Sequence, residues 1–223
     1  MERFWQVLVQ KSPYFFATLV GGLETTLVVA AGAMVFALGF GLVVALMRLS
    51  QLRLLRWPAI AYIEFIRGTP ALVQLFVIYF GLPDAGLRPS PLQAAIVGLG
   101  INGAAYLAEI YRAGIAAVPH GQWEAAACLG MTGWLAFRRI ILPQAVRTIL
   151  PPMTGDFVAL FKDTSIVSTI AVVELSKQYQ ILSKSSMKYL EIGLLTAALY
   201  LLMSVPLGLL SRRLERIWGR GIL

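Results

Sequence analysis

Cysteine and histidine are nearly missing from this chain of 223 residues, which contains one of each, Cys128 and His120. A single cysteine excludes an intramolecular disulfide framework. One cysteine and one histidine are also too few for the ligand clusters that bind zinc. We therefore expect the chain to bind no metal or cofactor of its own.

Charged residues are also scarce, at 13% of the sequence against about 25% in ordinary soluble domains. Hydrophobic residues make up 58%, and the mean hydropathy is +0.76. This balance is typical of a protein whose solvent is mostly lipid. The net charge of +8 raises the question of nucleic-acid binding, but the basic residues lie in short clusters beside apolar runs. That pattern is typical of membrane topology signals, so we expect a lipid bilayer and no nucleic acid as a partner.

The sequence lacks any Gly-Lys dipeptide, so the phosphate-binding pattern G-x-x-x-x-G-K-[ST] does not occur in it. The chain therefore cannot form the main ATP site of a P-loop enzyme. Any use of ATP requires a second protein.

Five apolar segments predict five membrane-spanning helices. The first, residues 25–47, contains no charged residue over about 35 Å of helix, enough to cross a hydrocarbon layer roughly 30 Å thick. The others cover residues 58–80, 92–112, 149–173 and 192–210. The second is weakest at residues 64–70, and we expect the fourth to break, because it contains Pro151-Pro152, Asp156 and Lys162-Asp163. The sequence thus predicts an all-α membrane protein in which residues 1–223 form a single domain.

Small residues recur every four positions in the first segment, at Ala33, Ala37, Gly41 and Ala45. Such a stripe lets a second helix approach closely. The alternative is ordinary small-residue filler, and the sequence favours neither.

The distribution of Lys and Arg predicts the orientation of the chain. With five crossings, eleven basic residues fall on the side of the C-terminus and six on the side of the N-terminus. The richer side is expected to be cytoplasmic, so the N-terminus is periplasmic. The first eleven residues lack the pattern of a cleaved signal peptide, and we expect the first span to target the chain and stay in place. The eleven are Arg48, Arg53, Arg56, Arg112, Arg138, Arg139, Arg147, Arg212, Arg213, Arg216 and Arg220, and the six are Arg3, Lys11, Arg88, Lys177, Lys184 and Lys188.

A polar loop at residues 113–147 separates the third and fourth segments. Pro119 suits the start of a short helix, and Gly130 suits a left-handed cap at its end. Thr132 can cap a second helix over residues 133–142, which Pro143 is expected to end. The sequence therefore predicts a helix–turn–helix displayed at the membrane face, serving either to dock a protein or to lie on lipid headgroups. A DNA-reading role is implausible between two membrane spans.

The spacing of this loop resembles the EAA motif of permease subunits of type I ATP-binding-cassette importers. The matching residues are Glu124, Ala125, Ala126, Gly130, Ile140, Leu142 and Pro143. The rest of the chain resembles the polar amino-acid branch of that family, whose permeases carry histidine, glutamine, arginine, glutamate or cystine. The stretches that carry this resemblance are Arg67-Gly68-Thr69-Pro70, Asn102 to Glu109, Gln122-Trp123, Pro151-Pro152 and Lys162-Asp163-Thr164-Ser165.

The resemblance implies a non-catalytic subunit of a bacterial inner-membrane importer. Its expected partners are two ATPase subunits that carry ATP and Mg²⁺, a second permease subunit, an external solute-binding protein and an amino-acid substrate. Glu124, Ala125, Ala126 and Gly130 would form the turn that docks on the ATPase. Ile140, Leu142 and Pro143 would fix the second helix against the membrane bundle.

Ionisable and polar residues at membrane depth are candidates for the substrate pathway. Asn102, Tyr106 and Glu109 share one face of the third helix. Glu109 or Asp163 would meet a substrate ammonium, and Asn102, Thr164 and Ser165 would bind its carboxylate. The alternatives are a stabilising Lys162–Asp163 charge cluster and interfacial pairs of Glu109 with Arg112 and of Glu64 with Arg67.

Two other functions stay open. An importer for another small polar solute would share the coupling loop, which is more widespread than any one substrate site. A passive channel would need no ATPase, so the coupling loop argues against it.

Overall fold

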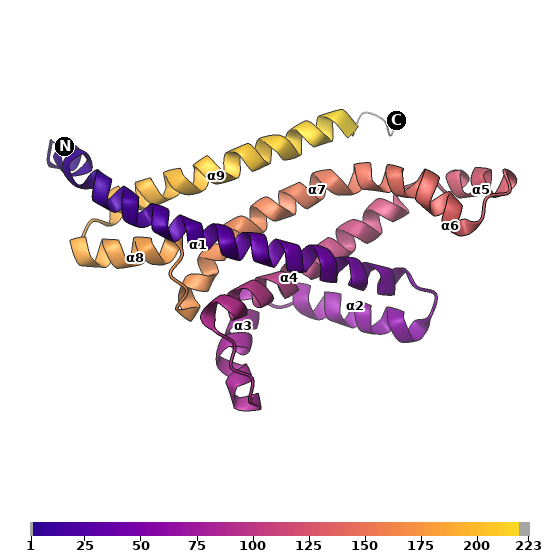
Figure 1. Ribbon diagram of the computed structural model, residues 1–223, viewed down its shortest axis with the longest axis horizontal. Helices are drawn as coiled ribbons and strands as arrows, with labels where there is room; N and C mark the ends of the chain where they lie inside the picture. The colour runs from indigo at the N-terminus through magenta and orange to yellow at the C-terminus, as the bar shows by residue number, and fades with distance from the viewer. Residues whose placement is uncertain (1, 219–223) are drawn as a thin grey trace.

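A computed structural model describes residues 2–218, with side chains for residues 13–217, and every regular element among them is helical (Figure 1). Met1 and residues 219–223, with Arg220 of the topology count, lie outside the described part, as do the side chains of Arg3 and Lys11. The long helices run roughly along one axis; α1 begins at one end of the molecule, and α9 ends past the middle, short of α5 and α6 (Figure 1). The helices are α1 (Glu2–Leu49), α2 (Arg53–Arg67), α3 (Ala71–Phe76), α4 (Pro91–Ala116), α5 (His120–Cys128), α6 (Gly133–Ala136), α7 (Leu142–Asp163), α8 (Leu175–Ser186) and α9 (Tyr189–Trp218). Tighter or wider helical turns cover Val77–Gly81, Leu82–Ala85, Phe137–Ile141 and Thr164–Ile170.

The centre of the bundle is the close packing of α1 against α4. Ala33 and Ala37 of the small-residue stripe are fully buried. A methyl group added at Gly41 would lie 2.9 Å from the carbonyl oxygen of Ala104, so the two backbones touch there. In lipid the hydrophobic effect does not drive helices together, because the lipid tails are themselves apolar. Close van der Waals contact of this kind therefore stabilises the pair. Close approach, rather than filler, is thus the role of this stripe.

The predicted second span is not one straight helix. Its two parts, α2 and the helical segment Ala71–Ala85, meet at an angle of 104° at residues 68–70. Pro70 has no N–H to donate and disfavours helical backbone at the residue before it, which explains the break. The Nε2 of buried Gln74 donates to the carbonyls of Ile66 at 2.8 Å and Thr69 at 3.1 Å. The hinge is therefore held by a specific side chain.

The fourth segment is expected to break, and the structure shows no break at its prolines. Helix α7 runs unbroken through Pro151 and Pro152. The carbonyl of Pro151 accepts hydrogen bonds from Thr154 Oγ1 at 2.7 Å and from Ser211 Oγ of α9 at 3.1 Å. Hydroxyls of the same and neighbouring helices commonly satisfy backbone groups near prolines in lipid. The break instead comes at Lys162-Asp163, the last of the features expected to cause it, after which the chain continues as the tight turn Thr164–Ile170.

Pro143 does not end a helix, contrary to the sequence prediction. It lies in the first turn of α7, which continues directly from α6 through the wide turn Phe137–Ile141. The N–H of Leu142 bonds to the carbonyl of Phe137, five residues back. This wider spacing lets the helical path continue through a proline whose ring would clash with a carbonyl four residues earlier.

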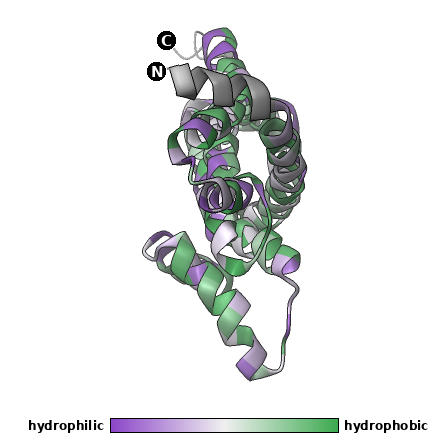
Figure 2. Cartoon of the chain, turned by 90° about the vertical axis from the view of Figure 1, so that its left-hand side faces the viewer, coloured by the Kyte–Doolittle hydropathy of each residue, from purple (hydrophilic) through white to green (hydrophobic). Residues whose placement is uncertain are grey.

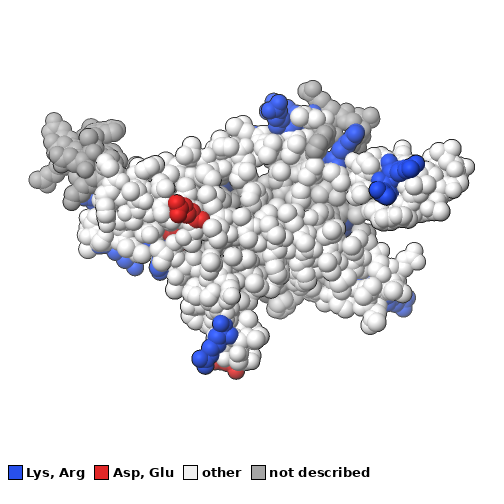
Figure 3. Space-filling view, in the orientation of Figure 1, with Lys and Arg blue, Asp and Glu red and all other residues white. Residues whose placement is uncertain are grey.

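Three described helices are long and apolar enough to cross a membrane, covering Pro13–Leu49, Pro91–Ala116 and Tyr189–Ile217, and the bent pair of α2 with Ala71–Ala85 makes up to four. Five crossings with a periplasmic N-terminus stay a prediction. Hydrophobic residues cover much of the helices, including the arm formed by α3 and the turns after it (Figure 2). On the face in Figure 3, charged residues lie mainly toward the ends of the molecule and the tip of that arm.

Candidate functional site

The predicted turn between two helices is formed, although the second helix continues past Pro143 into α7. Gly130 follows α5 with φ +71°, a left-handed conformation that favours glycine. The N–H of Met131 bonds to the carbonyl of Ala126 at 3.1 Å and that of Gly130 to Ala127 at 2.9 Å, which is a Schellman cap. Thr132 Oγ1 then accepts from the Leu135 N–H at 3.4 Å and starts α6. Both expected caps are confirmed.

The turn lies at one end of the molecule (Figure 1), and both polar and apolar side chains are exposed on it. Glu124 and Ala125 are exposed, and the Glu124 carboxylate lies 3.2 Å from the His120 imidazole. Ala126 is fully buried beneath them. Leu129 and Trp134 are 78% and 70% exposed, which is unusual for large apolar side chains near a polar turn. The shape suits a partner surface that brings both a basic group and an apolar recess.

The second helix is anchored by a different residue from those predicted. Ile141 is fully buried in an apolar cluster with Val118, Ala145 and Ile149, and Ile140 packs at its edge as expected. Leu142 and Pro143, by contrast, are exposed, so they do not fix the helix against this chain's own bundle. The apolar residues at helical spacing over residues 137–145 could have predicted that Ile141 is buried.

A cavity of about 560 Å³ lies where the α2–α3 hinge meets α4 and α7. Its lining brings together three predicted pathway residues, Asn102, Tyr106 and Asp163. It also includes Arg67 and Asp156, to which the sequence analysis gave no pathway role. Thr164 and Ser165 do not line it. Thr164 is fully buried and donates its hydroxyl to the Phe161 carbonyl at 2.7 Å.

Asn102 is held in this cavity by the hinge. Its Nδ2 donates to Gln74 Oε1 at 3.0 Å, while Gln74 Nε2 donates to Thr69 Oγ1 at 2.7 Å. The remaining oxygen of the Asn102 amide accepts no hydrogen bond from the described residues. The hinge, Gln74 and α4 thus form one connected polar network, and a movement of the hinge would move Asn102.

A second cavity of about 510 Å³ adjoins the first and shares Arg67, Tyr106 and Asp156 with it. Glu109 lies in this second cavity and not in the first. Its Oε2 accepts from Arg112 Nε at 3.1 Å, and its Oε1 lies 3.0 Å from Arg48 Nε. The Glu109–Arg112 pair raised as an alternative is therefore present, and it occupies the carboxylate.

The charges of the two cavities are arranged around the shared residues. The Arg67 guanidinium lies over the Tyr106 ring, 5.3 Å from its centroid. Asp156 and Asp163 are seven residues apart on one face of α7, about 10 Å along its axis. One guanidinium and two carboxylates can bind a zwitterion of an amino acid by its opposite charges. Asp156 was detectable in the sequence as an acidic residue within an apolar segment.

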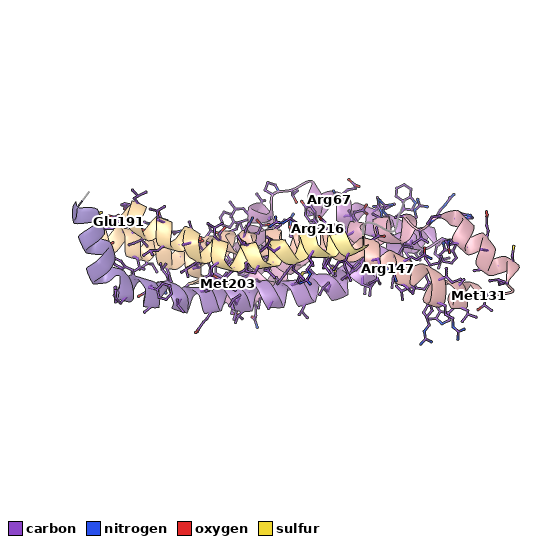
Figure 4. All side chains as sticks on the ribbon, turned by 90° about the horizontal axis from the view of Figure 1, so that it is seen from above. Arg67, Met131, Arg147, Glu191, Met203 and Arg216 are labelled. Atoms are coloured by element: carbon purple, nitrogen blue, oxygen red, sulfur yellow. The ribbon has the colours of Figure 1, made fainter. Side chains whose placement is uncertain are left out.

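The two parts of the site are far apart along the molecule. Arg67 lies near the middle of the long axis, whereas Met131 lies at the end formed by α5 and α6, with Arg147 between them (Figure 4). Any coupling between the turn and the cavities must pass along α4 or α7, which connect the two regions. Among the described residues, no group of three metal-ligating side chains is close enough to hold a metal ion.

Comparisons with known proteins agree on a transport family. The chain is 40% identical over 195 residues to the probable amino-acid ABC transporter permease protein YckA of Bacillus subtilis, covering 87% of this chain and 84% of that protein. It is 38% identical over 200 residues to the glutamine transport system permease protein GlnP of Escherichia coli, covering 89% and 91%. The L-cystine transport system permease protein TcyB of Bacillus subtilis matches at 38% over 214 residues, covering 94% and 91%.

Solved structures give the same result. A structure titled "Crystal structure of an amino acid ABC transporter with histidines" matches with a TM-score of 0.87 and 39% identity, over 92% of this chain and 96% of that one. Residues 37–221 match the sequence family described as binding-protein-dependent transport system inner membrane component. This chain belongs to that family and is an inner-membrane permease subunit of an ATP-binding-cassette transporter.

Proposed function

We propose that this permease carries a polar amino acid inward through the two adjoining cavities along α4 and α7. The observation that carries the proposal is their shared boundary of Arg67, Tyr106 and Asp156. A guanidinium for the substrate carboxylate and carboxylates for its ammonium are what an amino acid requires. Asn102 adds an amide oxygen that is free to accept a hydrogen bond.

Energy would come from a separate ATPase docked on the turn formed by Glu124, Ala125, Ala126 and Gly130. The exposed carboxylate and the apolar side chains beside it support this role. Ile140 would transmit the force through its contact with the buried cluster, while the exposed Leu142 and Pro143 would face the ATPase or the headgroups. Closure of the ATPase dimer would then tilt α7 and α4 as rigid bodies.

The assembly would contain a second permease subunit, two ATPase subunits that carry ATP and Mg²⁺, and an external solute-binding protein. Five crossings are formed by α1, the bent α2–α3 pair, α4, α7 and α9, and residues 113–147 form the cytoplasmic coupling loop within a single domain. The start of α1 at one end of the molecule and the end of α9 on the other side of its middle support an odd number of crossings (Figure 1). Two relatives are named for glutamine and L-cystine transport, and the similar solved structure is of an amino acid ABC transporter with histidines, which supports a polar amino acid as cargo.

The test is uptake into proteoliposomes that contain the permease with its cognate ATPase and binding protein. We expect ATP-dependent accumulation of at least one polar amino acid and none of an apolar amino acid such as leucine. If only a different small polar solute accumulated, the proposed substrate class, polar amino acids, would be wrong. Equilibration of substrate without ATP would indicate a passive channel and contradict the proposal.

A further inference from the structure

A third cavity lies at the end of the bundle where α1 turns into α2. Its volume is about 360 Å³, and it is lined by Arg48, Arg56 and Arg112 together with the polar connection Ser50-Gln51. Three arginines come from three different helices here, α1, α2 and α4. This cavity is separate from the two cavities of the proposed pathway, although Arg112 borders one of them.

The cavity has an excess of positive charge. None of its lining residues is acidic, and Glu109 is the carboxylate that pairs with Arg48 and Arg112. Arg56 makes no ion pair with any side chain of residues 13–217, which are those that the structure describes. Three guanidiniums against one carboxylate leave about two positive charges uncompensated. Like charges that line one cavity repel one another, and a bound anion would relieve this repulsion.

The guanidiniums also have donors to spare. Arg48 Nη1 is buried and makes no hydrogen bond with the described residues. The Arg48–Glu109 contact has ion-pair distance but not hydrogen-bond geometry, because Glu109 Oε1 likewise has no hydrogen-bond partner. A buried donor without an acceptor is costly, and an arginine fork fits phosphate oxygens particularly well.

The rim of the cavity identifies the source of the anion. Leu49, which lines the cavity, is 41% exposed, and Leu52 and Leu54, which follow in the chain and do not themselves line it, are 65% and 86% exposed. Trp57, next to Arg56, is 66% exposed, as expected of a side chain at the membrane interface. A soluble phosphate would gain nothing from this apolar rim, whereas the acyl chains of a lipid would pack on it.

We propose that this cavity binds the phosphodiester headgroup of an anionic phospholipid, with the acyl chains on the leucines of the rim. Basic pockets between membrane helices are suited to such headgroups. The lipid phosphate bridges Arg48, Arg56 and Arg112 and so ties the α1–α2 connection to α4. The lipid is a structural ligand and not a transported substrate.

The test uses the assembled importer in nanodiscs of phosphatidylcholine with increasing phosphatidylglycerol, and native mass spectrometry to count retained phosphatidylglycerol. The variant is Arg56→Gln, which changes a cavity residue outside the proposed pathway. The matched control is Arg53→Gln, one turn earlier on α2 and not among the lining residues. We expect about fivefold weaker retention for Arg56→Gln, the effect of one basic residue near an anionic surface, and little change for Arg53→Gln. Arg56→Lys should retain most of the affinity.

Each alternative outcome overturns a defined part of the proposal. Equal losses for Arg56→Gln and Arg53→Gln would indicate general surface attraction and contradict a specific cavity. Retention of phosphatidylcholine as strongly as phosphatidylglycerol by the wild-type importer would show that the cavity does not require an anionic lipid. Displacement of the bound lipid by millimolar inorganic phosphate would assign the cavity to a free anion and contradict the lipid as its source. Thermal unfolding in phosphatidylcholine alone separates these results from loss of folding, because a folded Arg56→Gln variant unfolds there like wild type.

Discussion

The Arg67 guanidinium lies over the ring of Tyr106, 5.3 Å from its centroid, and both residues border the two cavities along α4. Arg67 ends α2, just before the hinge, and Tyr106 lies in the middle of α4. The contact therefore connects the end of α2, beside the hinge, to α4, the most buried of the three long apolar helices. These two residues, together with Asp156, form the boundary that the two cavities share.

Replacement of Tyr106 by leucine should slow uptake. The ring face holds the guanidinium in place, and a cation–π contact of this kind stabilises it by about 1 kcal/mol. We expect about a fivefold lower initial rate of ATP-dependent uptake for Tyr106→Leu. Tyr106→Phe keeps the ring and should stay within about twofold of wild type. Equal rates for all three proteins would show that the contact has no part in transport.

Removal of the Asp156 charge should impair transport more strongly, because Asp156 borders both cavities. A charge-assisted hydrogen bond to a substrate ammonium contributes about 1.5–3 kcal/mol, so Asp156→Asn should reduce uptake at least about tenfold. Asp84→Asn, at the tip of the α3 arm and outside both cavities, is the control and should leave uptake unchanged. Initial uptake rates at several substrate concentrations measure both effects. A wild-type rate for Asp156→Asn would place the ammonium elsewhere.

A bulky residue at Gly130 should uncouple ATP hydrolysis from uptake. Its φ of +71° makes a β-branched residue strained, at about 1–2 kcal/mol, although no neighbouring atom lies within 4 Å of an added Cβ. Gly130→Val should therefore distort the turn without disturbing the rest of the fold. Gly130→Asn tolerates the left-handed region and should retain most coupling. The measurement is the number of substrate molecules imported per ATP, and an unchanged ratio for Gly130→Val would contradict docking at this turn.

The contact between α1 and α4 predicts a difference between two neighbouring glycines. An alanine at Gly41 would place its methyl group 2.9 Å from the Ala104 carbonyl oxygen, whereas at Gly39 nothing lies within 4 Å. Overpacking of this kind costs about 1–3 kcal/mol, so Gly41→Ala should lower the melting temperature by several degrees. Gly39→Ala should leave it unchanged or raise it slightly, since alanine favours the helix. Thermal unfolding of the two variants in detergent decides the point, and equal melting temperatures would contradict close packing at Gly41.

The features that the sequence predicted well are those set by local chemistry. Gly130 and Thr132 cap adjacent helices through bonds that span only a few residues. The α1 stripe was readable because its period matches the helix. Only the structure shows that this stripe is an interface, because it identifies α4 as the helix packed against it.

The features that the sequence missed depend on residues distant in the chain. Ser211 of α9, sixty residues later, donates to the Pro151 carbonyl within α7, a contact that no local pattern specifies. Arg67 enters the site because it lies beside the hinge at residues 68–70, which lines the same cavity as residues of α4 and α7, and no local pattern specifies that meeting. Glu109 lines the second cavity, as its helix face suggested, but its ion pair with Arg48 of α1 could not be predicted from the third span alone.

The proposed function requires that ATP hydrolysis on a partner drives amino-acid import through this subunit. The most direct test is the ATPase rate of the assembled importer in proteoliposomes, with empty and with amino-acid-loaded binding protein. We predict a higher rate with the loaded binding protein, together with uptake that stops when ATP is withheld. An ATPase rate indifferent to the loaded binding protein, with uptake that continues without ATP, would contradict the claim.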